Sequence, residues 1–170
     1  ELENDAVATA FDNKLVNVRA TVTQREQKSI SGTSGFQLFH RDYKAEGEEA
    51  LSPPVTGDGF ALFTLQEVDL RAARLQFGGR FDHTSYKPSG LSRRSFTGWS
   101  GAAGVHVPLW EDGAFVANYT HSFRAPAVEE LYNYGPHIGN LAFEIGDITL
   151  AREAADGVDL SLRHKSSRLE

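Results

Sequence analysis

The sequence contains no cysteine and no methionine, and it has no long apolar run. Without cysteine, disulfides, thiol nucleophiles and thiolate metal ligands are excluded. Because methionine is missing even at position 1, we expect a processed or excised piece of a longer protein, with Leu169 and Glu170 as an expression-vector scar. No stretch approaches the roughly 18 apolar residues of a spanning helix, and no signal peptide is visible.

Basic residues are also scarce. Lysine and arginine number 17 against 23 aspartates and glutamates, which gives a net charge of -6. The one basic cluster, "SRRS" at 92–95, is too short to outweigh this acidity, so a nucleic-acid partner is not expected. With 170 residues, of which 40% are hydrophobic and 24% charged, the chain is expected to form a single domain over 1–168.

What the sequence does contain is a period of two. In 73–83, Leu75, Phe77 and Phe81 alternate with polar residues such as Gln76 and Arg80, which puts an apolar row on one face of a β-strand. The alternation recurs, in places with more noise, over 15–22, 36–43, 60–70, 96–109, 115–123 and 158–162. The sequence therefore predicts an all-β protein of about seven or eight strands.

The connections between these strands alternate in length. "LRAA" at 70–73 and "WEDG" at 110–113 allow only tight turns, whereas the segments that begin at Gly47, Lys87 and Arg124 are long. Such alternation predicts an antiparallel up-and-down meander with all the long connections at one end. Within the last long segment, "AVEELYN" at 127–133 predicts one short helix that packs over the mouth of a barrel.

Three stretches carry a resemblance to a known family. They are "FHRDYKAEGEEALSPPVTGDGFALFTLQEV", "LQFGGRFDHTSY" and the stretch that contains "SFRAPAVEELYNYGPHIGNLAFEIGD". Over roughly 6–165 the chain resembles the barrel of TonB-dependent outer-membrane receptors, most closely the branch for zinc and related ligands. The resemblance implies an outer-membrane parent that imports a metal or metal chelate, with short periplasmic turns and long extracellular ligand-binding loops.

The chain departs from this family in two respects. Nothing in it resembles the plug domain, and seven strands are too few for the wide receptor barrel. A barrel fragment has two unpaired edges, and its lipid-facing row would meet water. We therefore expect either closure into a small lipocalin-like barrel with that row turned inward, or a homodimer paired edge to edge, and in both cases a soluble fragment.

Histidine is the main candidate metal ligand in a chain without cysteine. The strand centres place Asp42, His83, His121 and His137 toward the long-loop end, and His106 near a tight turn. Three histidines with an aspartate could hold zinc or another divalent metal and leave one coordination position open. Each histidine taken alone also fits an ordinary strand or loop position. "GPHIGN", which frames His137 with glycines and a proline, is the most ligand-like context, by its local character and by the resemblance.

Two functions fit these patterns, and no residue is assigned a catalytic role. In the first, the chain is part of a transport receptor for a metal or metal chelate. In the second, it is an independent small barrel that binds a hydrophobic ligand, or a hydrolase in which histidine-bound metal activates water against esters or phosphotriesters.

Overall fold

A computed structural model describes residues 2–3, 6–7, 9–27, 29–47, 50–137 and 141–165. The expected vector scar at Leu169 and Glu170 lies outside these ranges. At the N-terminus, β1 (Leu2–Glu3) and β2 (Ala6–Val7) pair as a two-residue ladder. Among the described residues, no helix is long and apolar enough to cross a bilayer.

The main sheet has seven strands in the order β11-β8-β7-β6-β5-β4-β3. Every neighbouring pair is antiparallel and consecutive along the chain among these strands, so the predicted meander is confirmed. The strands are β3 (Thr9–Gln27), β4 (Ile30–Gly47), β5 (Val55–Asp69), β6 (Arg74–Pro88), β7 (Arg94–Trp110), β8 (Gly113–Arg124) and β11 (Glu153–His164).

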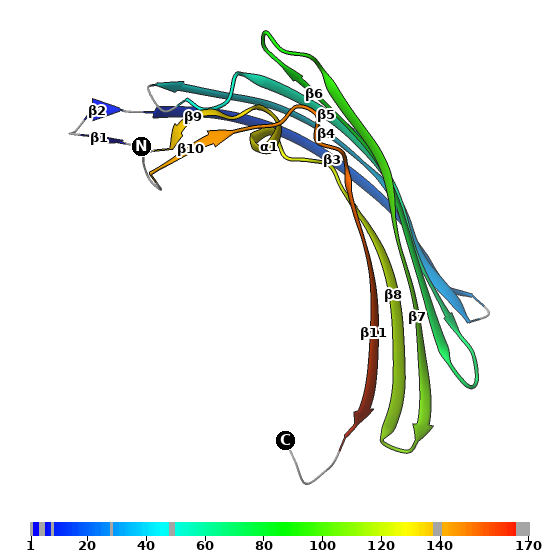
Figure 1. Ribbon diagram of the computed structural model, residues 1–170. Coiled ribbons are helices and arrows are strands. Elements are labelled where there is room, and N and C mark those ends of the chain that lie inside the picture. The colour runs from blue at the N-terminus through cyan, green and yellow to red at the C-terminus, as the bar shows by residue number, and fades with distance from the viewer. Residues whose placement is uncertain are drawn as a thin grey trace.

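The sheet is strongly curved and open (Figure 1). Its two edges, β3 and β11, have no partner strand on their outer sides among the described residues, so the single chain does not close into a small barrel. Pairing between two copies stays a prediction. The predicted short helix is confirmed as α1 (Val128–Tyr132), and it lies with β9 (Tyr134–His137) and β10 (Ala142–Ile145) on the concave side.

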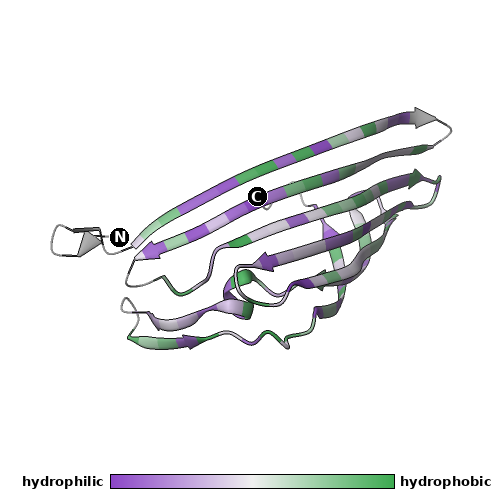
Figure 2. Cartoon of the chain, turned by 90° about the horizontal axis from the view of Figure 1, so that it is seen from above, coloured by the Kyte–Doolittle hydropathy of each residue, from purple (hydrophilic) through white to green (hydrophobic). Residues whose placement is uncertain are grey.

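The register divides the strand residues between two faces. Val55, Tyr86 and Phe96 pack with α1 in the one described cluster of buried apolar residues, so we call their side of the sheet the inner face. Because side chains alternate, Phe63, Arg80 and Asp82 share this inner face, as the pairing of Phe63 with Arg80 shows. Apolar and polar residues follow one another along each strand, as the colours of Figure 2 show.

The outer face carries an apolar band. Many of its large side chains are 40% to 76% exposed, because no residue that the structure describes covers them. They include Val16, Val18, Phe36, Leu38, Phe60, Leu62, Phe77, Phe81, Trp99, Tyr119 and Leu160. The predicted apolar row is thus formed, but it lies on the outer side and is not turned inward as closure would require.

Phe123 departs from this row. The pairing of β7 with β8 reaches only Gly101 and His121 at the loop end, and beyond it Phe123 packs against the inner cluster. A Cβ on Gly98 would lie 2.1 Å from the Phe123 ring, so the ring occupies the space that a side chain at Gly98 would need. Beyond the end of the ladder between β7 and β8, packing against the α1 cluster decides where this ring lies.

Candidate ligand site at the loop end

Helix α1 is fixed to the sheet by three apolar side chains at helical spacing. Val128, Leu131 and Tyr132 are each no more than 4% exposed, and they pack on Val55 and Phe96 of β5 and β7. Pro126 precedes the helix, which suits a residue that supplies no backbone N–H and ends the preceding strand. The apolar pattern of 127–133 therefore anchors the helix over the inner face.

Arg124 joins the end of β8 to both sides of this segment. Its guanidinium donates to Glu130 at 2.9 and 3.0 Å and to both carboxylate oxygens of Glu153 at 2.8 Å. Glu130 also accepts a hydrogen bond from the backbone N–H of Ala127 at 2.7 Å, which satisfies a donor at the start of the helix. One arginine thus ties the start of α1 to the start of β11.

The hairpin of β9 and β10 follows the helix and has a polar side. Ala142 pairs with His137 and Glu144 with Gly135, so His137 and Glu144 lie on one side of the hairpin. His137 Nδ1 and Glu144 Oε1 are 2.6 Å apart, and Asn133 donates to Glu144 Oε2 at 2.6 Å. Asn133 is buried, and its side-chain oxygen accepts a hydrogen bond from Ser52. This network holds a histidine and a carboxylate together beside α1.

Two carboxyl groups of this segment are held in their charged form. The hydrogen bond from His137, and then that from Asn133, lower the pKa of Glu144 below its usual value of 4.5. The guanidinium of Arg124, and then the Ala127 N–H, lower the pKa of Glu130 in the same way. Near neutral pH the segment therefore presents an ionised Glu144 against His137, an arrangement that could accept a cation.

The other three predicted site residues lie on the outer face. Asp42 accepts from Thr56 at 3.0 Å, and His83 hydrogen-bonds Thr97 at 2.7 Å. His121 hydrogen-bonds Asp156 at 2.9 Å, and its ring stacks on Trp99 with 4.1 Å between centroids. All three lie toward the long-loop end as predicted, and His106 lies near the tight turn.

The structure does not bring the four predicted residues together. His137 belongs to the hairpin on the inner side, whereas Asp42, His83 and His121 are on the opposite face of the sheet. Among the described residues, no group of three or more histidines and carboxylates could hold a metal ion. The sequence predicted the end of the sheet at which these residues lie, but it did not predict that they lie on different sides of the sheet. Metal binding by any of them stays a prediction.

Two pairings were not anticipated from the sequence. His40 of β4 contacts Asp58 at 2.7 Å and Asp42 at 3.3 Å on the outer face. Glu144 is the partner of His137, seven residues further along the chain. The alternation along β4 and β5 could have placed His40 beside Asp58 once their register was known. The partner of His137 depends on a hairpin that the sequence pattern did not predict.

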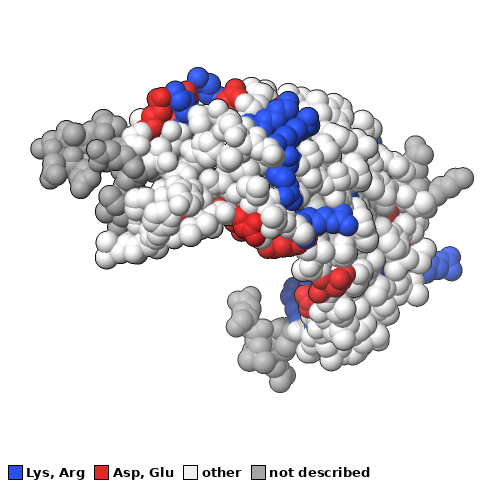
Figure 3. Space-filling model, turned by 45° about the horizontal axis from the view of Figure 1, so that its top comes forward, with Lys and Arg blue, Asp and Glu red and all other residues white. Residues whose placement is uncertain are grey.

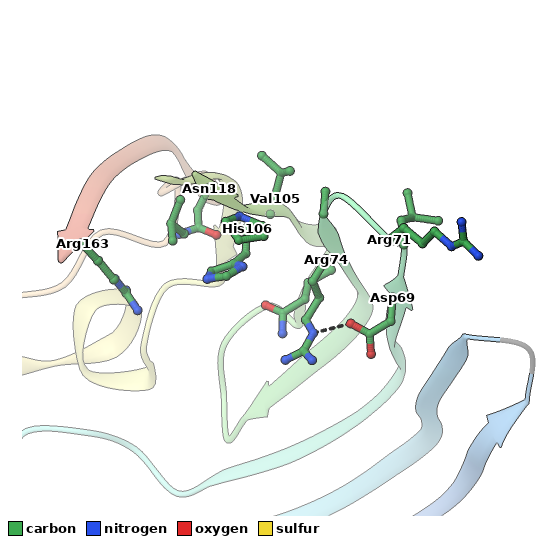
Figure 4. Close-up of a pocket in the computed structure, with 13 residues that line it drawn as sticks. Asp69, Arg71, Arg74, Val105, His106, Asn118 and Arg163 are labelled. Atoms are coloured by element: carbon green, nitrogen blue, oxygen red, sulfur yellow. Dashed lines mark hydrogen bonds and ion pairs between the residues drawn. The ribbon is translucent and has the colours of Figure 1, made fainter. Parts of the chain in front are cut away.

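A cavity lies at the opposite end of the sheet, near the tight turns (Figure 4). It has a volume of about 480 Å³ and is lined by residues near the tight turns, among them Arg74, His106, Asn118 and Arg163. Arg74 donates to Asp69 at 2.5 Å, and Arg71 points away from the cavity. Because its one carboxylate is already bound to arginine, this cavity offers a poor cation site, and the candidate ligand site stays with the hairpin.

Comparison with known protein families gives a match over most of the chain. The family model described as TonB dependent receptor-like, beta-barrel, matches residues 7–170. The chain belongs to the TonB-dependent receptor family. This explains an open, curved sheet whose inner face is polar and whose outer face is apolar, since such a sheet is one sector of the wall of an outer-membrane receptor barrel.

The receptor family also gives the sector its orientation and surroundings. The family is embedded in the outer membrane and binds ligands, so the apolar band of the outer face is the surface that meets lipid. In receptor barrels the short turns are periplasmic and the long loops extracellular. Helix α1 and the β9–β10 hairpin therefore lie at the extracellular mouth of the receptor, on its lumenal side.

Proposed function

We propose that this sector belongs to a receptor that takes up a metal ion or a metal chelate. The observation that supports the proposal is the pair of His137 and Glu144, 2.6 Å apart on a hairpin at the mouth. An imidazole and a carboxylate are both ligands of zinc and similar divalent ions. Both side chains are partly exposed, at 43% and 33%, so an incoming ion can reach them.

The pair by itself supplies two ligands. Two protein ligands suit transient capture of a cargo that completes its coordination with water, a chelator or other loops of the receptor. A resident structural ion would need about four protein ligands. A receptor must also release what it binds, so an incomplete ligand set is consistent with uptake.

The hydrolase hypothesis has less support. A metal that activates water in a hydrolase is held by about three protein ligands with one open position. The described residues contain no group of three histidines and carboxylates that could hold such an ion. No observation favours ester or phosphotriester hydrolysis, and we therefore propose uptake alone.

Uptake by the full-length receptor tests the proposal. Cells that depend on this receptor would be given limiting zinc, free or chelated, and their metal content measured. We expect His137→Ala and Glu144→Gln each to lower uptake about tenfold, because each removes one of two ligands. His106→Ala is the matched control, since this histidine lies near the periplasmic turns and should leave uptake unchanged.

Two outcomes would contradict the proposal. One is unchanged metal uptake in both hairpin variants when the amount of receptor in the membrane is equal. The other is growth supported through this receptor by a metal-free nutrient, with no change in cellular metal.

A further inference from the structure

The β9–β10 hairpin has an apolar side as well as the polar side described above. The register of its two strands places four side chains together on the side opposite His137: Tyr134, Pro136, Phe143 and Ile145. We call these four residues the apolar platform. Three of them are more than half exposed, at 71% for Tyr134, 56% for Phe143 and 73% for Ile145.

The hairpin turns its polar side toward the loop between β4 and β5 and its apolar side away from that loop. Gly135, on the polar side, lies so close to Leu51 that a Cβ added to it would be 2.8 Å from the leucine side chain. The Tyr134 N–H donates to the Leu51 carbonyl at 2.8 Å, and the neighbouring Asn133 is bonded to Ser52. Folding usually buries apolar side chains and exposes polar ones, so this inverted arrangement leaves an apolar surface exposed at the mouth of the receptor.

The two aromatic rings of the apolar platform contact each other. Tyr134 and Phe143 meet edge to face, with 5.3 Å between the ring centroids and 86° between the ring planes. This geometry leaves outward ring faces on which a flat aromatic ligand can stack. Because the face of an aromatic ring carries partial negative charge, it also favours a ligand with positive charge.

The size of the apolar platform fits a small molecule. Each strand of the hairpin has four residues, so at about 3.3 Å per residue the platform is about 13 Å long, and two adjacent strands make it about 10 Å wide. A stable protein–protein interface needs roughly 800 Å² from each partner, which is several times this area. The platform therefore matches the organic part of a small ligand and not a protein partner.

The segment that carries the apolar platform is acidic. Residues 125–151 contain no lysine or arginine and four carboxylates: Glu129, Glu130, Glu144 and Asp147. Arg124 contacts the segment but binds Glu153 as well as Glu130, and Arg94 donates to the Leu150 carbonyl, so negative charge stays in excess. Figure 3 shows acidic side chains grouped next to a broad uncharged surface on this side of the molecule. Such surroundings repel an anionic ligand and attract a cationic one.

We propose that the apolar platform binds the organic part of a metal chelate that is aromatic and carries no net negative charge. The inference rests on the metal uptake proposed above, and it names the class of chelate. An aromatic ring of the chelate stacks on Tyr134 and Phe143, and the carboxylates of the segment attract its positive charge. Neutral nitrogen donors such as pyridine give chelates of this kind, because they leave the charge of the metal ion in place. Anionic chelates built from carboxylates do not fit this surface.

Binding to the full-length receptor in detergent micelles tests this inference. The probe is the complex of one zinc ion with one terpyridine, a flat aromatic cation with open coordination positions. The comparison is zinc nitrilotriacetate, an anion without an aromatic ring, which we expect to bind about tenfold more weakly. Phe143→Ala should weaken binding of the terpyridine complex about tenfold and leave zinc nitrilotriacetate unaffected, whereas Phe143→Trp keeps a ring and should retain the affinity.

A leucine outside the hairpin provides the matched control. Leu91 is 50% exposed between β6 and β7, at the same end of the sheet but not on the platform. Ile145→Ala should weaken binding of the terpyridine complex about threefold, and Leu91→Ala should leave it unchanged. Glu129→Gln removes one exposed charge of α1 and should weaken binding of the terpyridine complex, but not of zinc nitrilotriacetate, about twofold.

The variants also separate this inference from the proposed metal capture. If His137→Ala weakens binding of both zinc complexes and Phe143→Ala of neither, the inference is wrong and the metal pair stands. If Phe143→Ala weakens binding of the terpyridine complex and His137→Ala weakens neither, the platform binds an aromatic ligand and metal capture by the hairpin is wrong. A change of oligomeric state in Phe143→Ala with no change in ligand binding would overturn the inference and make the platform a protein contact.

Discussion

Arg124 links the end of β8 to the start of α1 and the start of β11, beside the segment of α1, β9 and β10 at the mouth of the receptor. It binds Glu130 and Glu153 together in a forked geometry that lysine cannot reproduce. We expect Arg124→Lys to increase hydrogen exchange at the amides of Leu131 and Asn133, which donate to Ala127 and Glu129 within the helical turn.

The control for Arg124 is another arginine-to-lysine change with no such role. Arg71→Lys, in the tight turn between β5 and β6, should leave exchange in α1 unchanged. If Arg124→Lys also leaves it unchanged, the apolar contacts of α1 hold the segment without the ion pairs.

The carboxyl groups of Glu130 and Glu144 predict how the segment responds to acid. Both have a pKa below the usual 4.5, so their hydrogen bonds stabilise the segment fully above that value and are lost as the pH falls through the lowered pKa. The backbone amide of Ala127 donates to Glu130, and the side-chain amide of Asn133 donates to Glu144. In NMR spectra recorded from about pH 6 to about pH 3, the signals of these two amides should shift together in this lower range.

Glutamine substitution checks that assignment. In Glu130→Gln combined with Glu144→Gln the two positions no longer titrate, so both amide signals should lose this pH dependence. If the shift persists, other groups cause it.

Single residues were the least predictable part of the chain. The alternation correctly placed Asp42, His83 and His121 at the long-loop end of the sheet. Whether two side chains meet also depends on strand register and on the face each occupies, and a slip of one residue exchanges the faces. The pair of His137 with Glu144 depends, in addition, on a hairpin whose turn chemistry gave no clear signal.

At the scale of elements, the most deeply buried of the three side chains that anchor α1 is Leu131. Leu131 is 1% exposed at the centre of the apolar cluster. Leu131→Ala should lower the free energy of local unfolding of α1 by about 2–5 kcal/mol, because it removes buried methyl groups and leaves a cavity. Hydrogen exchange at the Asn133 amide would report this opening, while the β6 amides should keep their protection.

An exposed leucine in the same segment provides the comparison. Leu141 is 92% exposed, so Leu141→Ala should leave exchange in α1 unchanged. An equal effect of the two changes would mean that α1 is not anchored by burial.

The strands were predicted in number and order, but they extend beyond the ranges expected from apolar alternation. The strands of the main sheet are 12 to 19 residues long. The apolar signal covers only the part of each strand that meets lipid, whereas hydrogen bonding continues into the polar rim near Lys87 and Asp42. Helix α1 was predicted because Val128, Leu131 and Tyr132 keep helical spacing. The short strands β9 and β10 lack such a pattern.

At the scale of the whole molecule, the predicted meander topology was found, whereas closure of the single chain into a small barrel was not. Meander topology follows from local turn lengths and was confirmed. Closure depends on strands that pair across the two edges, and β3 and β11 remain apart in the described sheet. An apolar outer band of side chains such as Phe77 needs no closure if lipid covers it.

Neighbouring alanines at the middle of β7 test this arrangement of the wall. Ala103 pairs with Phe77 and Tyr119 on the outer face, whereas Ala102 pairs with Gly78 and Thr120 on the inner face. Arginine on the lipid face near the bilayer midplane costs about 2–4 kcal/mol of folding stability, and lumenal positions tolerate it. We therefore expect Ala103→Arg, but not Ala102→Arg, to destabilise the full-length receptor in lipid vesicles by this amount.

Urea titration of the full-length receptor folded in lipid vesicles measures the folding stability of each variant relative to the unaltered receptor. The starting residue, the introduced charge and the position along β7 are nearly identical in the two variants. Any difference in their stability therefore comes from the face of the sheet on which the arginine lies. Equal destabilisation would mean that both faces of β7 are packed or lipid-covered. A larger loss for Ala102→Arg would reverse the assignment of inner and outer faces.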